Sequence, residues 1–179
     1  VGYYPGAEEM FIKLIYSPED GKILGTQIVG GAGVDKRIDV IATAISFGGT
    51  VDQLAGLDLA YAPPYGAAKD PVHLAAFVAQ NTLRNLDRTV PPSTTKSNND
   101  AQWVDVRNPD EWEAGHLDGA IWVPLTDLRD RLEQLDRNKP VVTVCRGGQR
   151  SYYATRVLRQ NGFGNVATLS GGMAMQSHV

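Results

Sequence analysis

The chain has 179 residues, and seventeen Lys and Arg against twenty Asp and Glu leave a net charge of −3 without any basic run. This balance argues against a nucleic-acid partner or an anionic membrane surface, and no apolar stretch reaches the roughly 18–20 residues that a membrane-spanning helix needs. The single cysteine excludes an intrachain disulfide and any CxxC metal or dithiol site. We therefore expect a reducing, cytoplasmic setting and no metal.

The first half of the chain is predicted to form an α+β unit, a sheet with flanking helices. MFIKLIYS (10–17) and KILGTQIVG (22–30) are rich in β-formers and are joined by a turn with proline and glycine, which predicts a β-hairpin. Apolar residues recur at helical spacing over 35–49, where two glycines end the helix. Thr50 opens a short turn with the Thr-x-x-Gln spacing of a capping box, and Asp70, followed by proline, begins a further helix.

A change of composition separates the two halves. The stretch RTVPPSTTKSNNDA holds two prolines followed by Ser, Thr and Asn, which favour a linker over a packed core. We predict a first domain over 1–88, a linker over 89–100 and a second domain over 101–179. Each domain is small enough to bury only a modest core.

The second half alternates strands and helices, which predicts an α/β domain with a parallel sheet. VVTVC is continuously apolar, as expected of a parallel strand that is covered on both faces. The predicted strands are QWVDVR (102–107), AIWVPL (120–125), VVTVC (141–145) and NVATL (165–169). The predicted helices are a short one capped by Asn108, one with leucines along one face from Leu125 to Leu135, and one over 151–163.

The only cysteine ends the strand VVTVC and opens the turn to the next helix. Open α/β sheets bind ligands at the carboxyl ends of their strands, and the turn's amides lie at a helix N-terminus, which binds anions. Gly147 and Gly148 allow the backbone to curl with its N–H groups inward. These features favour the thiolate and covalent catalysis by Cys145, with an anion-binding loop of Arg146, Gly147, Gly148, Gln149 and Arg150. Were Cys145 an ordinary small buried hydrophobe, the arginines and glycines around it would have no role.

WVDVRNPDEWEAGHLDGAIWVP, VVTVCRGGQRS and GFGNVATLSGGM together resemble a single-domain rhodanese over 101–179. The resemblance implies a sulfurtransferase in which Cys145 takes sulfane sulfur from a small-molecule donor, carries it as a persulfide and passes it to a thiol acceptor. It also implies that Asp105, Arg107, Glu111 and His116 are supporting residues. On the residues alone, Arg107 and Glu111 could equally form an ordinary surface ion pair, and His116 is favoured as a structural hydrogen-bonding residue over a proton shuttle.

The first half resembles the C-terminal dimerisation domain of the pyridine nucleotide–disulfide oxidoreductases, through AEEMFIKLIYSPEDGKILGTQIVGGAGVDKRIDVIATAI and GLDLAYAPPYGAAKDPVHLAAFVAQN. The order of domains is that of the coenzyme A-disulfide reductase–rhodanese fusions. The resemblance implies a homodimer through 1–88 and a whole enzyme with FAD, NAD(P)H and coenzyme A, none of them bound by this part, whose FAD and NAD(P)H domains are absent here. It also implies that Tyr61 and Tyr3, with Tyr4 as the alternative to Tyr3, reach the thiol site beside the partner subunit's flavin.

The glycines of GGAGVD (30–35) suggest a dinucleotide-binding turn, but Lys36 stands where the third glycine of GxGxxG would fall. We therefore interpret this stretch as a loop that enters a helix.

Two other functions compete with sulfur transfer. A cysteine–arginine anion loop also suits a phosphatase, but phosphatases of related fold use a loop one residue longer, and one residue adds up to roughly 3.5 Å of chain. The loop Cys145–Arg150 therefore favours one sulfur atom over a tetrahedral phosphate. The other alternative is a non-catalytic module that pairs subunits and binds a partner, and the intact CRGGQR loop argues against it.

Overall fold

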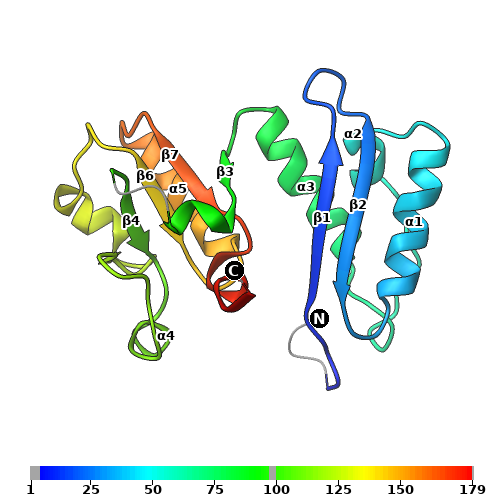
Figure 1. Ribbon diagram of the computed structural model, residues 1–179, viewed down its shortest axis with the longest axis horizontal. Helices are drawn as coiled ribbons and strands as arrows, with labels where there is room; N and C mark the ends of the chain where they lie inside the picture. Colours follow the sequence, from blue (N-terminus) through cyan, green and yellow to red (C-terminus); the bar gives the residue numbers. More distant parts are fainter. Residues whose placement is uncertain (1–4, 97–99, 179) are drawn as a thin grey trace. The chain divides into compact units, whose positions relative to one another are not determined.

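The computed structural model describes residues 5–96 and 100–178, and the gap at 97–99 falls in the predicted linker. The chain divides into two compact units, residues 1–84 and 85–179, and each is described by itself (Figure 1). Within the described residues, no helix is long and apolar enough to cross a membrane.

The described part of the first unit consists of a β-hairpin and three helices. β1 (Met10–Tyr16) and β2 (Ile23–Gly30) pair antiparallel, which confirms the predicted hairpin. The helices are α1 (Val34–Ser46), α2 (Val51–Ala55) and α3 (Pro71–Leu83). One face of the hairpin and the apolar faces of the helices enclose a core of Ile23, Ile41, Leu54, Val72 and Ala76.

The predicted starts of α2 and α3 are confirmed by their hydrogen bonds. Thr50 Oγ1 accepts a bond from the Gln53 amide at 3.3 Å, and Gln53 Oε1 accepts one from the Thr50 amide at 2.9 Å. Asp70 caps α3 by accepting a bond from the Val72 amide at 3.1 Å. Pro71 takes the first helical position, where the N–H that it lacks would have no partner within the helix. Local chemistry thus sets where both helices begin.

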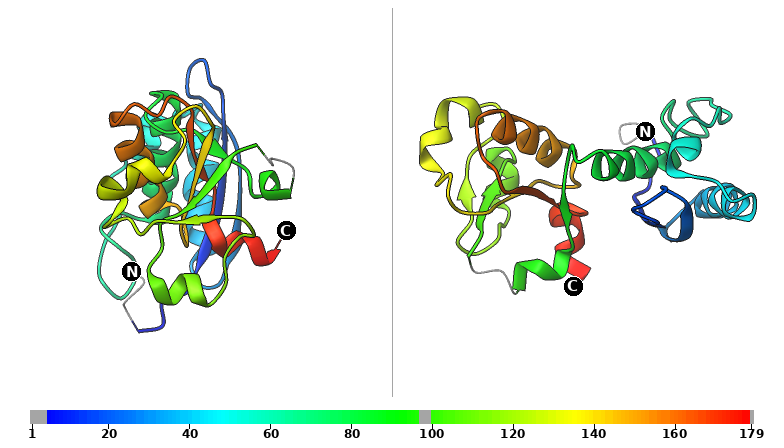
Figure 2. Two further views of the ribbon diagram at one scale, coloured as in Figure 1. Left: turned by 90° about the vertical axis from the view of Figure 1, so that its left-hand side faces the viewer. Right: turned by 90° about the horizontal axis from the view of Figure 1, so that it is seen from above.

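Within the described residues, the second unit is a five-stranded parallel sheet in the order β3-β7-β6-β4-β5. The strands are β3 (Thr89–Val90), β4 (Gln102–Asp105), β5 (Ile121–Trp122), β6 (Val141–Val144) and β7 (Val166–Leu169). The helices are α4 (Pro109–Glu113) and α5 (Gln149–Gln160), with 3-10 segments η1 (Pro92–Lys96), η2 (Leu128–Gln134) and η3 (Gly172–His178). Figure 2 (right) shows α5 and η2 over one face of the sheet and η1 and η3 over the other. The predicted α/β fold is confirmed.

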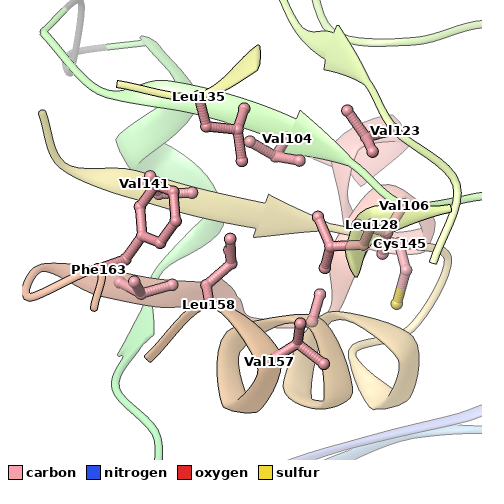
Figure 3. Close-up of a cluster of buried hydrophobic side chains, with 12 residues drawn as sticks. Val104, Val106, Val123, Leu128, Leu135, Val141, Cys145, Val157, Leu158 and Phe163 are labelled. Carbon is pink, nitrogen blue, oxygen red and sulfur yellow. The ribbon is translucent and has the colours of Figure 1, made fainter. Parts of the chain in front are cut away.

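β6 lies at the centre of this sheet and is buried on both faces. Its alternate residues enter two clusters, one under α5 that includes Val141 and Cys145 (Figure 3), and an opposite one that includes Val142 and Val144. A continuous apolar run is what such a strand requires. The carboxyl end of β6 delivers Cys145 to the edge of the sheet, where Asp105 of β4 pairs with Val144.

The predicted linker over 89–100 differs from the structure at its start, because β3 pairs in parallel with β7. The Thr168 amide donates to the Arg88 carbonyl at 2.7 Å, and the Thr168 hydroxyl donates to the buried carboxylate of Asp87 at 3.0 Å. Without β3, β7 would be an edge strand with unpaired backbone N–H and C=O groups. Pairing of residues 89–90 with these groups therefore extends the sheet into a segment whose composition predicts a loop. The division between the units therefore falls before Asn85 rather than after residue 88.

The helix predicted from Leu125 to Leu135 is wrong in type. η2 is a 3-10 segment interrupted at Arg131, whose φ of −126° and ψ of 22° are not helical. Leu128 and Leu135 are nevertheless buried. The leucine spacing indicates burial, which a kinked segment satisfies as well as an α-helix does.

Candidate active site

Cys145 follows β6 directly and is 1% exposed. The turn that it opens bends back so that two backbone amides face its sulfur: the Gly148 N–H donates to Sγ at 3.0 Å and the Ser151 N–H at 3.4 Å. Gly148 is the N-cap of α5 with a φ of 114°, a conformation that favours glycine. Amides at a helix N-terminus stabilise negative charge. The residue therefore combines a packed position in the core with a sulfur that receives charge-stabilising donors.

Arg150 and Glu111 meet in a two-pronged ion pair, although they lie 39 residues apart in the chain. Arg150 Nη1 donates to Glu111 Oε2 at 2.5 Å and Nη2 to Oε1 at 2.7 Å. Glu111 Oε2 also accepts a bond from the Asn108 amide at 3.2 Å. The hydrogen bond with Arg150 lowers the pKa of Glu111 to about 2, and the hydrogen bond with Glu111 raises the pKa of Arg150. The guanidinium is thus permanently charged and held in one orientation.

Asp105 and Arg107 form a second ion pair, which is buried. Arg107 Nε donates to both Asp105 carboxylate oxygens at 3.0 Å, and its Nη2 donates to Asp105 Oδ2 and to the Gly115 carbonyl, each at 2.7 Å. These bonds hold the chain on both sides of α4, the helix that carries Glu111. The surface pair between Arg107 and Glu111 considered from the sequence is not the arrangement found, since each residue has another partner.

His116 is exposed and contacts α4 rather than the cysteine turn. Its Nδ1 lies 3.1 Å from the Trp112 carbonyl oxygen, and its ring stacks on the Trp112 ring with centroids 3.6 Å apart. Trp122 also stacks on Trp112, with ring centroids 6.0 Å apart. Its indole N–H donates to the Arg107 carbonyl at 3.1 Å. These contacts fit the structural role preferred for His116, and the tryptophans that make them were not singled out in the sequence.

Three further loop residues form the outer side of the turn. Arg146, Gly147 and Gln149 are exposed, and Gln149 Nε2 donates to the Tyr153 hydroxyl at 3.3 Å. The structure therefore brings Cys145, its loop and Glu111 together past the carboxyl ends of β4 and β6, and the Asp105–Arg107 ion pair lies at the carboxyl end of β4.

The remaining predicted residues lie in the first unit. Tyr61 is 54% exposed in the segment between α2 and α3, whereas Tyr3 and Tyr4 lie outside the described residues. Ala32, in the GGAGVD stretch, donates its amide to Glu8 Oε2 at 2.6 Å, and a Cβ on Gly31 would overlap the same carboxylate. An antiparallel hairpin precedes this turn, and the Ala32 amide that could bind a phosphate already donates to the Glu8 carboxylate. These residues therefore do not fit a dinucleotide.

Among residues 5–96 and 100–178, no three His, Cys, Asp or Glu side chains gather as a metal site would require.

Comparisons with protein families match two parts of the chain. Residues 93–175 match the family described as rhodanese-like domain, and residues 1–71 match the pyridine nucleotide-disulphide oxidoreductase, dimerisation domain.

Among curated proteins, the NADH oxidase of Methanocaldococcus jannaschii is 45% identical over 83 residues, and a coenzyme A disulfide reductase of Staphylococcus epidermidis is 39% identical over 79 residues. The matches cover 46% and 44% of this chain, respectively, and 18% of each relative. The chain thus spans less than a fifth of the length of these relatives.

Two solved structures are similar over nearly all of the chain. Reduced Bacillus anthracis CoADR-RHD is 41% identical with a TM-score of 0.90, and the match covers 98% of this chain and 32% of that one. A NAD-dependent persulfide reductase from A. fulgidus is also 41% identical, with a TM-score of 0.86 over 97% of this chain and 31% of its own.

Proposed function

The chain is a pyridine nucleotide-disulphide oxidoreductase dimerisation domain followed by a rhodanese-like domain, and from this we propose that Cys145 accepts sulfane sulfur from a small-molecule donor and passes it to a thiol. The observation that carries the proposal is the environment of Sγ. Its two amide donors, from Gly148 and Ser151, come from the N-terminal turn of α5 at the end of the central strand. They would stabilise the thiolate that attacks and the thiolate that leaves.

Transfer needs two exchanges at sulfur. The Cys145 thiolate attacks the outer sulfur of a donor such as thiosulfate, a new sulfur–sulfur bond forms, and sulfite leaves with the electron pair of the broken bond. The Cys145 persulfide that results carries its negative charge on the outer sulfur. An acceptor thiolate then attacks this outer sulfur, and the Cys145 thiolate leaves with the bonding pair. The acceptor becomes a persulfide, and no external oxidant or reductant is consumed.

The phosphatase alternative has less support from the geometry. Phosphate is held best by an arginine that donates two parallel bonds to its oxygens. Arg150 gives that pair of bonds to the Glu111 carboxylate, at 2.5 and 2.7 Å. Together with the short loop, this favours sulfur as the group bound at Cys145.

Sulfite release from thiosulfate in the presence of an excess thiol tests the proposal. We expect continuous, Cys145-dependent turnover in the chain as it stands and none in Cys145→Ser, which replaces one sulfur by one oxygen. Hydrolysis of a small aryl phosphate, followed in parallel, should stay at the level of Cys145→Ser. Equal sulfite release by both proteins would remove Cys145 from the reaction, and Cys145-dependent phosphate release would favour the phosphatase.

We propose further that in the whole protein this unit serves a disulfide or persulfide reductase with coenzyme A as donor or acceptor, as the names of the relatives suggest. FAD and NAD(P)H, held by other domains, would supply the reducing electrons. The first unit would pair two subunits. Tyr61, and Tyr3 or Tyr4, would offer a hydroxyl to sulfur at the thiol site of the partner subunit. The exposure of Tyr61 in this structure leaves its hydroxyl available for that role.

A further inference from the structure

The last segment of the chain contacts the backbone of the cysteine turn. The Met173 amide donates to the Cys145 carbonyl at 2.8 Å, and the Ala174 amide donates to the Arg146 carbonyl at 2.9 Å. These bonds tie the start of η3 to the two peptide groups that follow the nucleophile. The sulfur-transfer steps described above make no use of this segment.

The two bonds determine which way the turn's peptide groups point. Because a trans peptide directs its C=O and N–H in opposite directions, carbonyls of Cys145 and Arg146 that point toward η3 turn the amides of Arg146 and Gly147 the other way. η3 covers one face of the sheet, and Cys145 belongs to the cluster on the other face, under α5. The turned amides therefore point to the face of the sheet on which the sulfur lies, where the Gly148 and Ser151 amides donate to it, as in an anion-binding nest.

Gly172 is what allows η3 to approach so closely. It is buried, its φ is +55°, and a Cβ at this position would lie 2.2 Å from the Cys145 carbonyl oxygen and 2.6 Å from that of Arg146. Backbone atoms cannot move aside as the end of a flexible side chain can. A side chain at residue 172 would thus push η3 and the turn apart.

We propose that Gly172, acting through the amides of Met173 and Ala174, is a positioning residue for the nucleophile. It brings η3 against the turn and so aims the turn's amides at the sulfur. This role rests on the proposed function in one respect only, namely that the Cys145 sulfur is the reacting atom. Gly172 acts through the backbone of the turn, whose Cys145 and Arg146 carbonyls it approaches.

Alkylation of the single cysteine by iodoacetamide, measured against pH, tests the proposal with Gly172→Ala and a matched control, Gly171→Ala. Gly171 has a φ of +69°, so both variants carry the same kind of backbone strain, but its Cβ would meet only the flexible side chain of Met175, at 2.2 Å. Both variants should lose thermal stability from the backbone strain, and Gly172→Ala should lose more because its Cβ also meets backbone atoms. Gly172→Ala should lower the alkylation rate at neutral pH by about tenfold, because the displaced turn no longer directs its amide N–H groups at the thiolate. Its half-maximal rate should require a higher pH, whereas Gly171→Ala should follow the wild-type profile.

A folded Gly172→Ala with the wild-type profile, or the same shift in Gly171→Ala, would overturn the proposal. If Gly172→Ala does not fold, replacing Met173 by its α-hydroxy acid removes the N–H that bonds to Cys145 and adds no side-chain atom. The same shift is then expected, and an unchanged profile counts against the role of the segment. Alkylation needs no sulfur donor, so this result is independent of whether the wild type transfers sulfur.

Discussion

The pKa of Glu111 is lowered by Arg150, a residue far along the chain. The hydrogen bond with Arg150 lowers the pKa of Glu111 from an ordinary 4.5 to about 2. A carboxyl group whose pKa is lower in the folded state stabilises the fold at pH values above its unfolded pKa. This stabilisation is therefore complete above about pH 4.5 and is lost as the pH falls toward 2.

We predict that Glu111→Gln lowers the free energy of unfolding at neutral pH by about 1.5–3 kcal/mol, the usual range for a hydrogen bond to a charged group. The difference from wild type should shrink as the pH falls from about 4.5 to about 2. Urea denaturation of both proteins across this range measures it. A difference that stays constant with pH would show that the ion pair is not its source.

The sequence supplied the supporting residues but not their pairing. Asp105, Arg107 and Glu111 follow from the family resemblance, whereas on the residues alone a surface pair between Arg107 and Glu111 is an equal possibility. Asp105 and Arg107 pair over only two residues. Arg150 and Glu111 lie 39 residues apart, and they meet because β4, which precedes α4, lies beside β6, which precedes the cysteine turn. Sequence spacing does not encode such a contact between distant segments.

At the level of elements, those governed by local rules could be predicted. The hairpin, α1, α2, α3 and the strands β4, β5, β6 and β7 of the second unit follow from periodicity, turn residues and caps. β3 could not be predicted because it forms only by pairing with the distant strand β7. η2 could not be predicted because its leucines are buried by a kinked segment as well as by a regular helix. The role of η3 was equally hidden, since only the close approach of Gly172 to the Cys145 carbonyl discloses it.

The attachment of the segment before β3 leads to a further prediction. The Thr168 hydroxyl donates to the buried Asp87 carboxylate and lies 3.1 Å from the Thr155 hydroxyl. Thr168→Val keeps the shape but leaves both partners one bond short, and we expect a loss of about 2–3 kcal/mol in the free energy of unfolding. Thr126→Val, at an exposed threonine, should change it little. Equal effects of the two substitutions would mean that residues 85–90 behave as a linker.

Burial raises the pKa of Asp87, so its effect on stability has the opposite sign to that of Glu111. Protonation of Asp87 favours the folded state, and the fold loses this benefit as the pH rises through the raised pKa. The hydrogen bond that the Thr168 hydroxyl donates opposes this rise because it favours the ionised carboxylate, so the cost of Thr168→Val should be larger at neutral pH than in acid. A cost that grows on acidification would contradict this assignment.

At the level of the whole molecule, most of the exposed large apolar side chains among the described residues belong to the first unit. They are Ile15, Leu24, Val29, Phe47, Leu57, Tyr61, Tyr65, Leu74 and Val78, each more than a third exposed. Large exposed apolar patches mark interaction sites, and residues 1–71 match the pyridine nucleotide-disulphide oxidoreductase, dimerisation domain. We therefore expect the homodimer to form through the first unit.

Leu74→Glu places a charge on the exposed side of α3, where the side chain is 51% exposed, and should shift sedimentation equilibrium from dimer toward monomer. Tyr153→Glu, at a 48% exposed aromatic on α5 of the second unit, is the matched control and should leave the equilibrium unchanged. Dimers of equal stability in both variants would place the interface elsewhere.

The central claim is that Cys145 carries sulfur, and the intact mass of the protein after incubation with thiosulfate tests it most directly. The chain has one cysteine, so a persulfide can form at one position only. We predict a gain of one sulfur atom that a thiol reductant removes and that Cys145→Ser does not show. No gain at saturating thiosulfate or polysulfide, or the same gain in Cys145→Ser, would contradict the account.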